Sequence, residues 1–193
     1  MKRSDAETRP SEARDRLLGT ASRIFYAEGI HSVGVDRIIA EAQVTRATFY
    51  RHYPGKEDLV LAYLHASHEI ERAAVEAAVA SGQPPVEILR AIAGGIAQYI
   101  RSPGFRGCAF LNAVAEYSDP ANPVHQAVTD HRQWFLDTIT TLMSGATPTA
   151  RHFVLLRDGA MVSGCLSDPA PVSETFLQAV ESLLQTHPTT QPT

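Results

Sequence analysis

The stretch VDRIIAEAQVTRATFYRHYPGKEDL, residues 35–59, holds the pattern that decides the fold of this chain. The apolar residues of its first eight positions recur at helical spacing, which predicts a short helix over residues 35–42. Thr45 is suited to cap a second short helix that runs to His52. The sequence at 53–55, Tyr-Pro-Gly, then breaks the chain. Two short helices joined by a three-residue turn predict a helix-turn-helix.

The rest of the chain also shows helical periodicity, and no segment alternates as a strand does. A helix is expected before this stretch, over residues 11–28, with Gly29 as its stop. A long helix is expected from Lys56, with Ile70 on its buried side. The remaining expected helices span about 85–101, 107–117, 122–143, 148–166 and 172–186. The predicted fold is therefore all-α with about nine helices, the three leading ones short.

Charge is distributed unevenly along the chain, whose formal net charge is −4. Residues 1–56 carry ten basic and seven acidic side chains, a net +3, and the remainder carries seven basic and fourteen acidic ones, a net −7. A basic head on an acidic body indicates that only the head meets a polyanion. Ordinary variation of surface charge explains the same numbers, so the motif has to decide between these readings.

Several classes of protein are excluded or unsupported by the sequence. No apolar run reaches the length of ~18 residues that a membrane span needs, and the N-terminal residues 1–16 lack the apolar stretch of a secretory signal. Cys108 and Cys165 lie far apart, which argues against a disulfide framework and for a reducing compartment. We therefore expect a cytoplasmic protein. Nucleophile-elbow, phosphate-loop and zinc-protease motifs are absent, so no enzyme activity is expected.

The segment TRATFYRH, residues 45–52, suits insertion into a DNA major groove. Phe49 is expected to face inward as an anchor, so that its neighbours project outward. An outward arginine can bind guanine O6 and N7 with two hydrogen bonds, and small side chains can contact thymine methyl groups. The residues predicted to read bases are Arg46, Ala47, Thr48 and Arg51. The residues predicted to contact phosphates are Thr45, Tyr50, His52 and Lys56.

Residues 14–64 resemble the DNA-binding domain of TetR-type (tetracycline-repressor-like) transcriptional regulators. The most specific part of the resemblance is the run from Thr48 to Tyr53 followed by Lys-Glu-Asp-Leu at 56–59. The resemblance implies a homodimer that binds a palindromic operator, usually as a repressor that a small molecule releases. Two positions depart from the family pattern. Gln43 stands where the turn usually has glycine, and Gly34 stands where a hydroxyl residue often caps the second helix near a phosphate.

The resemblance also implies how the chain is organised into domains. We expect a disordered arm over residues 1–10, a helix-turn-helix domain over 11–55, a ligand-binding and dimerisation domain over 56–187, and a disordered tail over 188–193. The expected partners are double-stranded DNA, a second copy of the chain and a small-molecule effector. No membrane partner, cofactor or metal is expected.

In this family the middle helices line a ligand cavity and the last two helices form the dimer interface. Aromatic, apolar and polar side chains of the middle helices are the candidates for the cavity: Tyr99, Phe105, Cys108, Phe110, Asn112, Glu116, Tyr117, His131, Trp134, Phe135 and Met161. Arg157 is a further candidate for a polar contact. The candidates for the dimer interface are Phe153, Leu156, Ala160, Gly164, Phe176, Val180 and Leu183.

Three alternatives remain open from the sequence. Cys108 follows Gly107 at an expected helix N-terminus beside Arg106, a setting that favours a reactive thiolate; the alternative is a small buried apolar residue. His65 and His68 share one helix face with Glu69, but a metal site needs a further convergent ligand. A helical carrier or enzyme that has lost DNA binding would show turnover without operator binding.

Overall fold

The computed structural model describes residues 11–186, and over this range the chain forms nine α-helices and no strand, which confirms the predicted fold class. The expected arm over 1–10 and tail over 188–193 lie outside the described residues. The chain divides into two compact units, and the first unit ends at Tyr63. The helices are α1 (Glu12–Glu28), α2 (Val35–Glu41), α3 (Arg46–His52), α4 (Lys56–Val79), α5 (Pro85–Ile100), α6 (Ala109–Glu116), α7 (Pro123–Leu142), α8 (Thr147–Leu166) and α9 (Pro169–Thr186).

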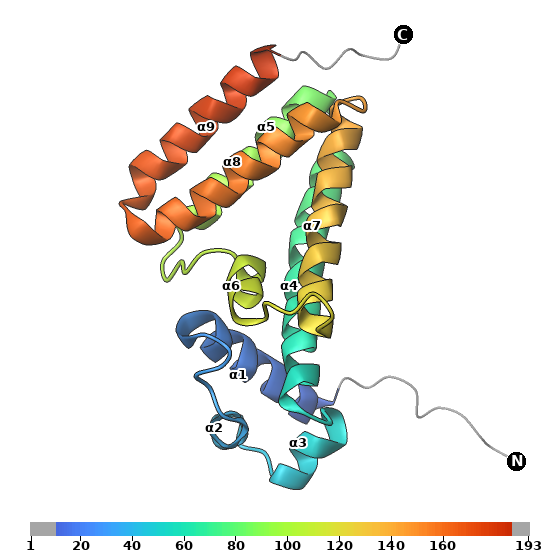
Figure 1. The fold of residues 1–193 in the computed structure, drawn as a ribbon, viewed down its shortest axis with the longest axis vertical. Coiled ribbons are helices and arrows are strands. Elements are labelled where there is room, and N and C mark those ends of the chain that lie inside the picture. Colours follow the sequence, from blue (N-terminus) through green and yellow to red (C-terminus); the bar gives the residue numbers. More distant parts are fainter. Residues whose placement is uncertain (1–10, 187–193) are drawn as a thin grey trace, which may run out of the picture. The chain divides into compact units, whose positions relative to one another are not determined.

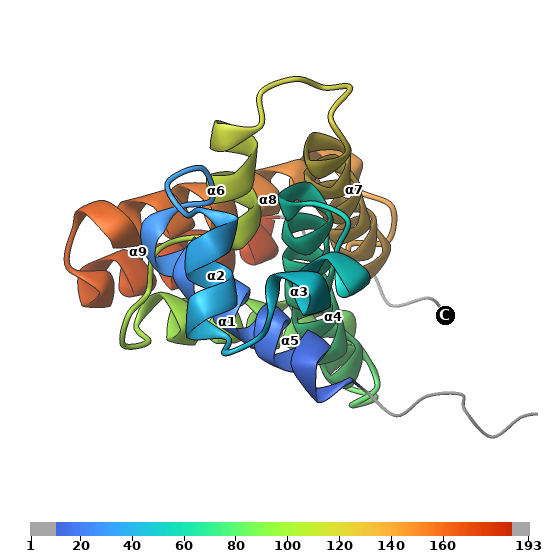
Figure 2. The same ribbon diagram turned by 90° about the horizontal axis from the view of Figure 1, so that it is seen from below.

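The first unit is built on the helices α1, α2 and α3 (Figure 2), which contact one another. Their buried side chains form an apolar core. Phe49 of α3 is fully buried in it, which confirms its expected role as the inward anchor. The ring of Phe25 lies 5.9 Å from that of Tyr63, so the first turns of α4 belong to this unit. The other buried apolar side chains of the three helices and their links are Leu17, Ala21, Ile24, Ile30, Val33, Ile38, Ala42 and Tyr53.

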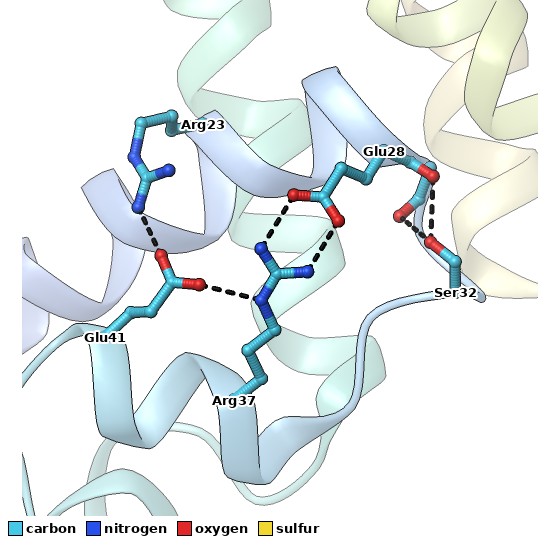
Figure 3. A network of polar contacts seen from close by, with 6 residues as sticks. Arg23, Glu28, Ser32, Arg37 and Glu41 are labelled. Carbon is cyan, nitrogen blue, oxygen red and sulfur yellow. Dashed lines mark hydrogen bonds and ion pairs between the residues drawn. The ribbon is translucent and has the colours of Figure 1, made fainter.

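A network of ion pairs joins α2 to α1 on the exposed side of this unit (Figure 3). Arg37 binds both oxygens of Glu28 through its Nη atoms at 2.5 and 2.7 Å, and its Nε donates to Glu41 at 2.7 Å. Glu41 also accepts from Arg23 at 2.5 Å. The Arg37 guanidinium lowers the pKa of the Glu28 carboxyl, and Arg23 and Arg37 lower that of Glu41. Both carboxylates are therefore ionised at neutral pH, and their ion pairs connect α2 to α1.

The turn between α2 and α3 has the conformation that the sequence suggested. Gln43 adopts a φ of 53°, a left-handed conformation in which a side chain costs about 1 kcal/mol relative to glycine. Gly34 caps α2 at a φ of −80° without any side-chain hydrogen bond, as its lack of a hydroxyl requires. Thr45 caps α3, because its side chain accepts a hydrogen bond from the Thr48 backbone N–H at 3.1 Å.

In the second unit, α5, α7, α8 and α9 pack on one another, and α8 lies alongside α9 (Figure 1). Gly164 of α8 lies against the end of α5 and the segment that follows it, because a Cβ at this position would lie 2.7 Å from Ile100 and 2.9 Å from Phe105. The small residue predicted for contact between two copies therefore serves a close approach within one chain.

Several details of the predicted helices are wrong. The three leading helices are not all short, since α1 has 17 residues, whereas α6 among the later helices has eight. α9 begins at Pro169 rather than near residue 172, because proline fits the first turn of a helix, where its missing N–H is not needed. Ile70, predicted to be buried, is 72% exposed. The inward side of α4 in the second unit instead carries Leu64 and Val75, which are both buried. No described helix is long and apolar enough to span a bilayer.

Candidate functional site

The first candidate site is the exposed side of α3. Arg46, Ala47, Tyr50 and Arg51 are exposed, at positions that share one helix face, whereas Phe49 is fully buried on the other. Tyr50 is 48% exposed, and its ring packs edge-on against that of Phe49 at 5.1 Å. The helix therefore presents a face rich in hydrogen-bond donors, and its buried ring fixes the orientation of that face.

Several of the predicted DNA contacts are engaged within the protein. Arg46 is paired with Asp36 of α2, and both side chains are largely exposed. His52 Nε2 lies 3.2 Å from the hydroxyl oxygen of Ser11, at the start of α1. The Lys56 ammonium lies 6.0 Å from the centre of the Phe25 ring. The Thr48 hydroxyl lies 2.9 Å from that of Thr45.

The second candidate site is a cavity of about 250 Å³ in the second unit. Its walls come from α6, α7 and α8. Among the residues expected from the sequence, Cys108, Phe110, His131 and Phe135 line it, and so does Arg157. The cavity has further lining residues that were not expected from the sequence, namely Leu111, Val114, Val128, Thr129, Arg132 and Val154. These are mostly aliphatic residues at core spacing, and helical periodicity does not distinguish a wall from a core.

The other expected cavity residues lie elsewhere in the second unit. Tyr99 packs edge-on against Phe105, with ring centres 5.3 Å apart. Asn112 is exposed and donates to the Arg106 carbonyl at 2.9 Å. Met161 is buried in the core. Trp134 is half-buried and lies against His68, with ring centres 4.9 Å apart. Glu116 and Tyr117 are half-buried at the end of α6.

A buried arginine dominates the charge around this cavity. Only 6% of the Arg157 side chain is exposed, and Cζ lies 5.1 Å from the centre of the Phe135 ring. Its Nη2 donates to Glu71 at 3.1 Å and to the Cys108 Sγ at 3.6 Å, and its Nη1 donates to Asp158 at 3.2 Å. Burial alone would lower the pKa of Arg157, but these three neighbours raise it above its usual value. The guanidinium is therefore permanently charged.

His131 is the second polar group in the cavity wall, and it is neutral. Burial, followed by the charge of Arg157, lowers the pKa of His131 to about 3. Its ring stacks on Phe110 with ring centres 3.5 Å apart, and its Nδ1 lies 3.0 Å from that of His68. Among the described residues, no group of three histidine, cysteine or acidic side chains is placed to hold a metal ion.

Most of the side chains that were predicted for the dimer interface are buried within a single chain. Phe153, Ala160, Phe176 and Val180 are buried within the chain, where they form the contact between helices of the same copy. Leu156, Gly164 and Leu183 are half-buried. The exposed apolar side chains of α8 lie on another face, at Leu155, Val162 and Leu166. Helical periodicity identified the apolar face of α8 and α9 that packs mainly within the chain, and the sequence analysis did not identify the exposed apolar face of α8.

Known proteins are similar to this chain both in the helix-turn-helix and over most of its length. Residues 17–63 match the family of bacterial regulatory proteins described as the tetR family. The crystal structure of SCO4454, a TetR-family transcriptional regulator from Streptomyces coelicolor, is 62% identical, with a TM-score of 0.89 over 91% of this chain and 96% of that one. The chain belongs to the TetR family. It is a helix-turn-helix transcriptional regulator, and the resemblance seen in the sequence is confirmed.

More distant relatives match shorter parts of the chain at lower identity. The TetR-family chain is 32% identical over 87 residues to the HTH-type transcriptional regulator TcmR of Streptomyces glaucescens, over 43% of this chain and 38% of TcmR. It is 27% identical over 84 residues to the uncharacterized regulator YxaF of Bacillus subtilis, over 43% of this chain and 44% of YxaF. The chain thus matches less than half the length of these curated relatives, which are themselves transcriptional regulators.

Proposed function

We propose that this TetR-family regulator binds a palindromic operator as a homodimer, represses transcription there, and leaves the DNA when a small molecule occupies the second unit. The observation that carries the proposal is the exposed face of α3, which presents Arg46, Ala47 and Arg51 while the fully buried Phe49 anchors the opposite face. A short rigid helix with donors on one face fits the major groove, which is ~12 Å wide. The cavity that Arg157 lines supports the proposal that a small molecule binds in the second unit.

Footprinting on the DNA that flanks the protein's own gene tests this proposal. We expect two protected half-sites related by a dyad, with centres about one helical turn (~34 Å) or a multiple of it apart, because each copy supplies one reading helix. Protection without a dyad would contradict the dimeric mode of binding. The absence of protection on any genomic fragment at low salt would overturn the proposed function as a whole.

Arg46→Ala is expected to relax the preference for one base position. A bidentate arginine–guanine contact discriminates by about 1–3 kcal/mol, so affinity for the best operator should fall about 10- to 100-fold, while affinity for unrelated DNA changes little. Binding curves on an operator and its single-base variants measure this difference. An unchanged base preference would show that Arg46 does not read the sequence.

Two companion variants separate base reading from phosphate contact. Lys56→Ala should weaken binding to all sequences alike and reduce the salt slope by about 1. Asp36→Ala should keep the base preference and strengthen binding, because it frees Arg46 from its ion pair and removes a negative charge close to the DNA-reading face. A weaker operator complex in Asp36→Ala would instead show that the ion pair positions Arg46 for binding.

A second candidate function is thiol-based sensing at Cys108. Cys108 is the N-terminal cap residue of α6, and the Arg157 Nη2 donates a hydrogen bond to its Sγ at 3.6 Å. Hydrogen peroxide would oxidise this thiol to a sulfenic acid with release of water. We expect peroxide to release operator DNA from the native protein but not from Cys108→Ser. If both proteins respond equally, the thiol is a packing residue.

A further inference from the structure

The inward side of α4 in the second unit carries polar residues where a core-facing stripe is normally apolar. Leu64, His68, Glu71 and Val75 follow one another at the spacing of a single helix face, and the first and last are buried. His68 contacts His131 and Trp134, and Glu71 contacts Arg157. Core-facing helix positions are normally apolar, and polar residues at such positions are found mainly at functional sites.

The carboxylate of Glu71 occupies an anion position that two cavity-lining residues create. Its Oε2 lies 3.1 Å from Arg157 Nη2 and 3.5 Å from His131 Nε2. His131 is 4% exposed, and its Nε2 makes no hydrogen bond to the described part of the chain. If His68 donates to His131 Nδ1, the proton of the neutral His131 ring sits on Nε2. Arg157 and His131 then both offer N–H groups to one oxyanion.

The three members of this arrangement differ in how easily they can move. Arg157 is held by burial, by Asp158 and by its position over the Phe135 ring, and His131 is held by its stacking on Phe110. The Glu71 side chain is 35% exposed, so it can rotate into water. Burial also raises the pKa of Glu71, which means that its charged form is disfavoured there. Glu71 is the exchangeable partner.

We propose that the effector is a small organic carboxylate that replaces the carboxylate of Glu71 on Arg157 and His131 and places its apolar body in the cavity. The proposal rests on the proposed ligand-responsive function and names the chemical class of the ligand. The cavity of about 250 Å³ lies just below the ~300–1,000 Å³ typical of ligand pockets, which suits a ligand of one ring. Phe110, Val128 and Val154 provide apolar contacts for that ring.

The exchange links the cavity to DNA binding through α4. Glu71 lies on the helix that begins at Lys56 in the first unit and continues into the second. Once the carboxylate of the ligand satisfies Arg157, α4 loses its ion pair with α8. The ligand binds the state without this ion pair better than the state with it, and this difference in affinity is what a population shift requires.

Binding of paired probes to the full-length protein tests the ligand class. The probes are cyclohexanecarboxylate and benzoate, each compared with its carboxamide, which has the same shape but no charge. Trp134 is the one tryptophan of the chain and lies 4.9 Å from His68, so its fluorescence reports on the contact with α4. We expect the carboxylates to change this fluorescence in a saturable way and to bind at least about tenfold more tightly than the amides.

Glu71→Gln removes the internal competitor and is the sharpest variant. We expect it to bind the carboxylate probes about tenfold more tightly and to bind operator DNA more weakly even without probe. Glu69→Gln is the matched control, since Glu69 lies on the same helix, is exposed and pairs with Arg72. It should behave as the native protein. Arg157→Met should lose the preference for carboxylates, and Glu71→Gln keeps the proposal testable if that variant fails to fold.

The outcomes separate this proposal from the proposed function. Equal binding of carboxylates and amides, no binding of the carboxylates at millimolar concentration, or an unchanged affinity in Glu71→Gln would overturn the carboxylate exchange. Operator binding is measured in parallel. If the carboxylates bind as expected but operator DNA stays bound, the anion site stands and ligand-controlled release fails. If a cell extract releases the DNA while the carboxylates do not bind, ligand control stands and the exchange at Glu71 fails.

Discussion

Phe49→Ala lowers the free energy of unfolding of the first unit by about 3–5 kcal/mol, the usual range for deleting a fully buried phenylalanine ring. The ring is 0% exposed and contacts the rings of Tyr50 at 5.1 Å and Tyr53 at 6.2 Å. Its loss leaves a cavity beneath α3, whose seven residues are too few to form a stable helix alone. Denaturant unfolding followed by circular dichroism measures the change.

The same variant should lose binding to specific and unrelated DNA together, because the whole reading face depends on this anchor. Phe49→Leu is the matched control and should cost less than about 1.5 kcal/mol, since it keeps most of the apolar volume. Tyr50→Phe should leave stability nearly unchanged, because the Tyr50 ring is 48% exposed, but it should weaken DNA binding at all sequences. An unfolding midpoint of Phe49→Ala equal to that of the native protein would contradict the claim that the buried Phe49 ring stabilises α3.

Val162→Glu is expected to convert the proposed homodimer into monomers. Val162 is 51% exposed on α8, in line with Leu155 at 61% and Leu166 at 79%. Gly159 is exposed on the same face, and a Cβ at this position would have no atom within 4 Å. This position therefore leaves room for a helix of a second copy to approach α8 closely. A twofold axis would place each substitution in the interface twice. Two unpaired carboxylates there should weaken dimerisation more than about 100-fold.

Analytical ultracentrifugation of the variant measures the effect, and an operator-binding assay should show a parallel loss, because a single reading helix binds weakly. Ile70→Glu is the control. It replaces an even more exposed apolar side chain, 72% exposed on α4, and should leave the oligomeric state unchanged. A stable dimer in Val162→Glu would place the interface on another surface and would leave the exposed stripe of α8 unexplained.

The anchor, the caps and the turn of the helix-turn-helix could all be predicted from the sequence. Phe49, Thr45 and Gln43 act locally, through helical spacing, a side-chain cap and a backbone conformation, and such effects depend on residues within one or two turns. The face of α3 that remains exposed followed from the same spacing. The number of helices followed from the periodicity of the whole chain.

Tertiary packing decided what periodicity could not. An apolar face at helical spacing is the same pattern whether it packs on its own chain, as Phe153 and Phe176 do, or remains exposed, as Leu155 and Val162 do. The inward positions of His68 and Glu71 were equally hidden, because their partners His131 and Arg157 lie 63 and 86 residues further along the chain. The sequence alone therefore determined the fold class and the helix-turn-helix, whose causes are local. Only the folded chain determined which charges meet at the cavity, since those contacts exist only when distant helices pack together.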